Sequence, residues 1–90
     1  MEKIIITVVG KDTVGIIARV CTYLAENNVN ILDISQTITG GYFNMMMIAD
    51  ASSVSVSFSE FTEGLKKAGE EKGVIIRIQR EEIFDSMHRI

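Results

Sequence analysis

The residues best suited to chemistry lie in a glycine-containing segment at residues 10–15, where Asp12 stands between Gly10 and Gly15. Glycines at a turn of this kind let a ligand approach the backbone closely. If a helix begins directly after the segment, the free amides of its first turn favour an anion such as a carboxylate. Asp12 beside them could hold an ammonium group, so the segment could bind a zwitterion. Alternatively, Asp12 or Thr13 only caps the helix, and the glycines only form the turn.

Residues that could bind a metal or carry redox chemistry are few. Cys21 is the single cysteine, and we place it on the apolar side of a helix, where it has no second thiol for a disulfide or a metal site. His88 is the only histidine, and Asp85 precedes it by three residues, but two ligands are too few for a specific metal site. We therefore expect no metal and no cofactor. The methionines at 45–47 form either a pliable binding surface or the two ordinary faces of a strand.

The elements that would position the first loop follow from the spacing of apolar residues. A β-branched run predicts a strand over residues 3–9, and helical spacing predicts an amphipathic helix from 14 to about 27. Two further strands are expected over 30–39 and 42–50, joined by a tight turn at Gly40-Gly41. The inward residues of the helix are expected to be Ile17, Val20, Cys21 and Leu24, and those on one face of the second strand Leu32, Ile34, Gln36 and Ile38.

The last third of the chain repeats this pattern. Ser57 and Glu60 have the spacing of a capping box, which starts a helix that ends near residue 72 before Gly73. A final strand is expected over 74–79. In the first helix, Tyr23 is expected to lie on a face away from the inward residues. The order strand, helix, strand, strand, helix, strand predicts an α+β, ferredoxin-like fold, with a four-stranded antiparallel sheet and both helices on one face. We expect one domain over residues 1–80. The tail at 81–90 has apolar residues at helical spacing and is expected to be a short helix that packs on the domain or on a partner subunit.

Composition limits the class of protein. The 90 residues fit a single domain, and the net charge of −3 disfavours nucleic acid as a partner. No apolar run reaches the ~20 residues of a membrane span, and no signal-peptide pattern opens the chain, so we expect a cytoplasmic protein without a membrane partner.

Residues 10–20, Gly-Lys-Asp-Thr-Val-Gly-Ile-Ile-Ala-Arg-Val, closely resemble the opening motif of ACT domains. Residues 28–31, Asn-Val-Asn-Ile, resemble that family's second characteristic segment, and the order of elements agrees to about residue 80. The chain is similar to small stand-alone ACT proteins and to the ACT modules of the glycine-cleavage repressor and of formyltetrahydrofolate deformylase. It departs from many relatives at Val14, where they have proline, which leaves the loop less rigid.

This resemblance implies a regulatory, non-enzymatic module that binds a small molecule, typically an amino acid, and forms a homodimer or a higher homo-oligomer. The regulated enzyme or regulator would be a separate chain. In ACT domains the ligand commonly lies between the first loop and the start of the second strand of a partner. Carried across, this nominates as ligand-binding residues Gly10, Asp12, Val14, Gly15, Ile16, Asn30 and Ile31. Asn30 could instead be a simple turn asparagine, and some ACT domains only pair without a ligand.

Two other classes remain as alternatives. An acylphosphatase-like hydrolase shares the fold, and Gly15 with Arg19 superficially matches its loop and catalytic arginine, although Asp12 would repel a phosphate. An RNA-binding sheet is weakly suggested by Tyr42 and Phe43, but the basic residue and the later aromatic of that motif are missing.

Overall fold

The computed structural model describes residues 1–11 and 13–82 of the chain. In this part the predicted order is confirmed as βαββαβ. The bounds of the elements are β1 Lys3–Lys11, α1 Ile16–Glu26, β2 Asn30–Thr39, β3 Tyr42–Asp50, α2 Phe58–Glu71 and β4 Val74–Arg80.

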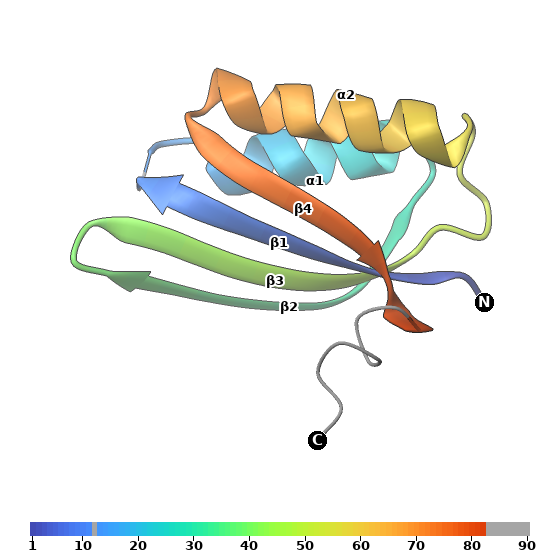
Figure 1. Ribbon diagram of the computed structural model, residues 1–90, viewed down its shortest axis with the longest axis horizontal. Coiled ribbons are helices and arrows are strands. Elements are labelled where there is room, and N and C mark those ends of the chain that lie inside the picture. The colour runs from blue at the N-terminus through green and yellow to red at the C-terminus, as the bar shows by residue number, and fades with distance from the viewer. Residues whose placement is uncertain (12, 83–90) are drawn as a thin grey trace.

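The strands form one sheet in the order β2-β3-β1-β4, and every neighbouring pair is antiparallel. Both helices lie against the same face of this sheet, as Figure 1 shows, so the ferredoxin-like prediction is confirmed. The hairpin between β2 and β3 turns at Gly40 and Gly41, whose φ angles of 59° and 82° are those that glycine adopts most readily.

The core lies between the helices and the two central strands. Strand alternation sends every second residue of β1 and β3 towards the helices, where these side chains are fully or almost fully buried. From the strands the core takes Ile4, Ile6, Val8, Phe43, Met45 and Met47, and from the helices Ile16, Val20, Leu24, Phe61 and Leu65. The predicted inward residues Val20 and Leu24 are therefore confirmed.

The two helices begin in different ways. Helix α2 starts as predicted, because the Ser57 hydroxyl oxygen accepts a hydrogen bond of 3.1 Å from the Glu60 amide. Helix α1 does not use Thr13 as its cap. Gly15, with φ 90°, is its N-cap residue, and the Thr13 hydroxyl donates to the Lys11 carbonyl instead. The helix begins at Ile16, two residues after the predicted start at Val14, because the chain must first turn at the left-handed Gly15.

This shift changes which residues of α1 face the core. Ile16 is buried and takes the place expected of Ile17, which is partly exposed. Tyr23, predicted outside the contact, packs against the core, and its hydroxyl donates a 2.9 Å hydrogen bond to the Phe61 carbonyl. The close approach is possible because Gly64 has no side chain: a Cβ there would lie 2.1 Å from the Tyr23 hydroxyl oxygen.

Strand β2 contains a register shift that strict alternation does not foresee. Ile31 pairs with Ala49 and Asp33 with Ile48, so Leu32 is the extra residue of a β-bulge. Leu32 therefore has no partner residue in β3, whereas Ile34 pairs with the buried Met47. The predicted tail helix lies almost wholly outside the described residues. Within the described part of the chain, no helix is long and apolar enough to cross a membrane.

Candidate functional site

An open groove of about 450 Å³ lies where β1 ends and α1 begins, next to the hairpin end of β2 and β3. Figure 1 shows this end of the sheet at the left, with the start of α1 above the β2–β3 hairpin. The loop and helix side of the groove consists of Thr13, Gly15, Ile16, Ile17 and Ala18, and the sheet side of Gln36, Ile38 and Phe43.

The helix side of the groove favours a negatively charged group. The first helical hydrogen bond of α1 runs from the Arg19 amide to the Gly15 carbonyl, at 2.9 Å. The amides of the three residues before Arg19 are therefore those that an α-helix leaves without a partner in its own turn. They carry the partial positive charge of the helix N-terminus, so this wall suits a carboxylate. The first turn of α1 holds no acidic residue that would compete for them.

The structure assigns different surroundings to the predicted loop residues. Gly15 lines the groove, and its positive φ explains the glycine. Val14 is not among the residues that line the groove and is 93% exposed, whereas Ile16 is 2% exposed and belongs to the core. Asp12 lies outside the described residues, so its predicted contact with an ammonium group stays a prediction.

Gly10 has a reason for being glycine that does not involve a ligand. A Cβ built on it would lie 2.8 Å from the Val74 Cγ1 atom, 2.9 Å from the Gly73 carbonyl oxygen and 2.9 Å from the Val74 Cα atom. Strand β4 therefore approaches β1 too closely for any side chain at this position. Gly10 is not among the residues that line the groove.

Asn30 and Ile31 lie at the other end of the sheet. Asn30 pairs with Asp50, which in turn pairs with Lys3, whereas Lys11 at the loop end pairs with Tyr42. The eight residue steps between Lys3 and Lys11 correspond to about 26 Å. A single chain therefore does not bring Asn30 and Ile31 to the first loop, and a site that contains both segments needs a second chain.

Sequence reasoning did not assign the sheet side of the groove. Gln36 and Ile38 were correctly placed on one face of β2, and their nearness to the first loop follows from the hairpin, which was also predicted. Those two signals together could have identified them. Lys72 was missed altogether: its Nζ atom lies 3.3 Å from the position of a Cβ at Gly15, which places a cation beside the loop. No local pattern links these two residues, which are far apart in the sequence.

Other chemical groups are held in structural roles. The Arg19 Nε atom lies 3.0 Å from a Glu71 carboxylate oxygen, and this hydrogen bond raises the pKa of Arg19. Cys21 is half-buried, and burial raises the pKa of its thiol, which makes it a weaker nucleophile. Across residues 1–11 and 13–82, no three histidine, cysteine, aspartate or glutamate side chains gather into a possible metal site.

Comparisons with a family model and with known protein sequences agree with each other. A sequence model of the ACT domain family matches residues 2–79. A UPF0237 protein of Bifidobacterium longum is 63% identical to this chain over 90 residues, which is 100% of both proteins.

Comparison with solved structures agrees. An ACT domain protein from Streptococcus pneumoniae is 41% identical, with a TM-score of 0.80 over 97% of this chain and 98% of that one. A formyltetrahydrofolate deformylase from Pseudomonas syringae is 27% identical, with a TM-score of 0.81 over 89% of this chain and 28% of that one. A putative glycine cleavage system transcriptional repressor is 25% identical, with a TM-score of 0.74 over 88% of this chain and 45% of that one. The resemblances noted from the sequence are thereby confirmed.

Proposed function

Because the chain belongs to the ACT domain family, a family of typically regulatory, ligand-binding domains, we propose that it is a sensor module that binds an amino acid as a homodimer. The observation that carries the proposal is the groove beside the first loop. Its helix side offers amides to a carboxylate, and its apolar wall, which includes Ile17, Ile38 and Phe43, suits an aliphatic side chain. Asp12, in the same loop, is proposed to bind the ammonium group.

The free edge of β2 supports a dimer that completes this groove. In the described sheet β2 is an outer strand, so one row of its backbone amides and carbonyls has no strand partner. If two copies pair antiparallel along β2 about a two-fold axis, the Thr39 end of one strand lies beside the Asn30 end of the other. Asn30 of the partner subunit then approaches the groove, where its amide can donate to a carboxylate and accept from an ammonium group.

A thermal-shift screen against the twenty amino acids tests the proposal. A ligand present at 100 times its Kd stabilises the folded state by about 2.7 kcal/mol. For a domain of this size that raises the Tm by about 10–20 °C. Asp12→Ala and Asn30→Ala are expected to remove the shift. Glu63→Ala, which changes an exposed carboxylate on α2, is the matched control and should keep it.

The outcomes separate the two forms of the proposal. If no amino acid shifts the Tm of a dimeric protein, the module only pairs and does not sense. If a ligand shifts the Tm but the Asn30→Ala variant responds like the control, the site lies within one subunit. A monomeric protein that binds no amino acid would refute the proposal as a whole.

The hydrolase alternative receives no support from the described loop. Its catalytic arginine would have to point into the loop, whereas Arg19 is held by Glu71 on α2. An RNA-binding sheet is likewise unsupported, because Tyr42 is exposed while Phe43, on the opposite face, is buried in the core. The two aromatic rings therefore do not form one stacking platform.

A further inference from the structure

The sheet face turned away from the helices is open and arranged in regular rows. Three neighbouring rows cross all four strands in the order β2, β3, β1, β4. They are Thr37, Asn44, Val9 and Ile75; Ser35, Met46, Thr7 and Arg77; and Asp33, Ile48, Ile5 and Gln79. We call these residues the open face, although Ile5 among them is only 5% exposed.

The open face exposes more apolar surface than a sheet that meets only water requires. The side chains of Ile75, Val9 and Met46 are 68%, 46% and 41% exposed. Two shallow hollows flank β1 on this side, one of about 270 Å³ towards β2 and one of about 300 Å³ towards β4. A contiguous apolar surface with hollows of this kind is typical of an interaction site.

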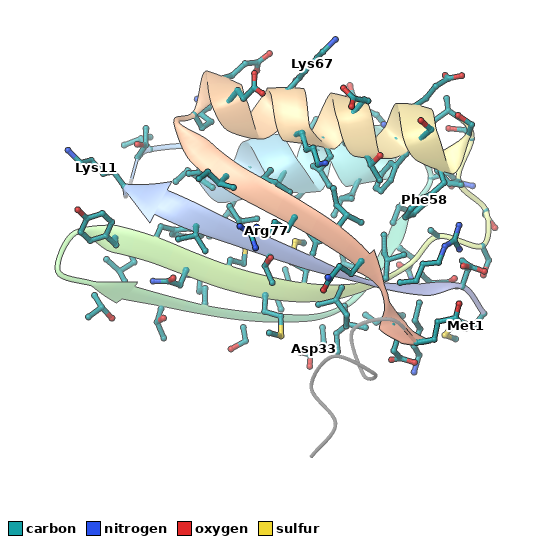
Figure 2. The ribbon with its side chains drawn as sticks, viewed as in Figure 1. Met1, Lys11, Asp33, Phe58, Lys67 and Arg77 are labelled. Atoms are coloured by element: carbon teal, nitrogen blue, oxygen red, sulfur yellow. The ribbon has the colours of Figure 1, made fainter. Side chains whose placement is uncertain are left out.

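The charges of the open face lie at its two opposite edges. Asp33 on β2 and Arg77 on β4 are the only ionisable side chains in the three rows, and both are labelled in Figure 2. Both are exposed. The three strand spacings between β2 and β4, together with the offset of one row along the strands, separate them by about 16 Å, too far for an ion pair within one chain. Neither forms an ion pair with another residue of the described ranges.

We propose that the open face binds the open face of a second copy of this chain, with Arg77 of each copy reaching Asp33 of the other, which lies one row, about 7 Å, further along the strands. A two-fold axis parallel to the strands, through the middle of the sheet, places β4 of one copy over β2 of its partner. The same rotation places β1 over the partner's β3. Both ion pairs then form at the edges, and the apolar residues meet in the middle, with the aligned strands that packed sheets prefer.

The charges select this arrangement over its main competitor. A two-fold axis across the strands would place β4 over β4 and β2 over β2. With that axis between the two rows, Arg77 would come within one row of Arg77 of the partner subunit and Asp33 within one row of Asp33 of the partner subunit, so both contacts would repel. Asp33 and Arg77 therefore disfavour the packing of β4 over β4 and stabilise the packing of β4 over β2.

The contact is expected to be weak and sensitive to salt. Four strands at about 4.8 Å and five residues at about 3.3 Å give roughly 320 Å² of sheet plane per copy. A standard interface buries about 800 Å² per partner. The contact uses neither the groove nor the outer edge of β2, so it can form with or without the dimer proposed above. If both contacts form, their two-fold axes do not intersect, so the copies build an open chain of alternating contacts rather than a closed tetramer.

Sedimentation equilibrium of the full chain with charge-reversed variants tests the arrangement. Arg77→Asp leaves two acidic residues on the open face, and Asp33→Arg leaves two basic ones. Each variant alone is expected to associate through this face at least about tenfold more weakly than the wild type. When the two variants are mixed, one crosswise pair forms with the wild-type signs and the other with the signs reversed, and association should return to within about threefold of the wild type.

The mixture distinguishes the proposal from loss of folding, because two misfolded variants would not rescue each other. Lys67→Asp, which reverses an exposed charge on α2 (Figure 2), is the matched control and should associate like the wild type. Single variants that associate like the wild type, or a mixture that stays as weak as its components, would overturn the crosswise pairing. If the association of the wild type does not depend on Asp33 or Arg77, the proposal is overturned as well. This holds whether another partner or residues 83–90 of the same chain would cover the face.

Discussion

Gly10→Ala should destabilise the fold through contact with backbone atoms rather than through loss of a ligand contact. The new Cβ would lie within 2.9 Å of three atoms, of which the Gly73 carbonyl oxygen and the Val74 Cα atom belong to the backbone. Overpacking of this kind costs about 1–3 kcal/mol. The lower entropy of alanine in the unfolded chain offsets up to about 1 kcal/mol. We therefore expect a net loss of about 1–2 kcal/mol in the free energy of unfolding, or roughly 4–16 °C in Tm.

Urea unfolding of Gly10→Ala, Val74→Ala and the double variant measures this effect. Val74→Ala removes the Cγ1 atom at 2.8 Å but leaves both backbone contacts, so it should not relieve the cost of Gly10→Ala. The two losses should then add to within about 0.5 kcal/mol. A Gly10→Ala variant as stable as the wild type would refute the argument from backbone approach. So would a double variant in which the cost of Gly10→Ala disappears.

Two further predictions concern the helix contact and the response to acid. Gly64→Ala should cost about 1–3 kcal/mol in the wild type, and measurably less in a Tyr23→Phe background, because the 2.1 Å contact is with the hydroxyl oxygen; equal costs in a double-mutant cycle would contradict this. The Asp50 carboxylate accepts hydrogen bonds from the Ser52 hydroxyl, the Ser52 amide and the Glu2 amide, which lower its pKa below the usual 3.8. Its contribution to stability is complete above that value and is lost as the pH falls through the lower folded pKa, so Asp50→Asn should flatten the acid loss of stability seen by urea unfolding below about pH 4. An unchanged pH profile would contradict the assignment.

The elements of this fold were predictable because their signals are local. A β-branched run placed β1, and the capping box at Ser57 placed the start of α2 to the residue. The paired glycines at 40 and 41 placed the hairpin. Each of these signals depends on neighbours in the sequence, and in this chain they agree with one another, as they do in sequences that specify one fold.

The parts that were wrong depend on contacts between distant residues. Tyr23 is inside because Gly64, on another helix, leaves room for its ring. The bulge at Leu32 follows from pairing with β3, which a single strand does not reveal. The start of α1 was displaced because Thr13 has a competing partner in the Lys11 carbonyl and the left-handed Gly15 ends the loop.

The candidate site was predicted in part for the same reason. The loop motif identified Gly15, whereas Ile38 in the groove wall and Lys72 beside the loop are far from it in sequence and are close only in the folded chain. The predicted contribution of Asn30 to the site depends on contacts even further from the local sequence. It lies at the far end of its own sheet, so only a second chain can bring it to the loop.

The exposed apolar residues of strand β2 favour the proposed pairing with a second copy of the chain. Ile34 and Ile38 pair with Met47 and Phe43, which are buried beneath the helices, yet the two isoleucines themselves remain 40% and 56% exposed. They point to the core side of the sheet but lie beyond the edge that the helices cover. A domain of about this size buries only some 60% of its unfolded surface, so it has little further core with which to cover them. Pairing along β2 would cover these two side chains and satisfy the free strand edge in one step, which a ligand in the groove alone would not do.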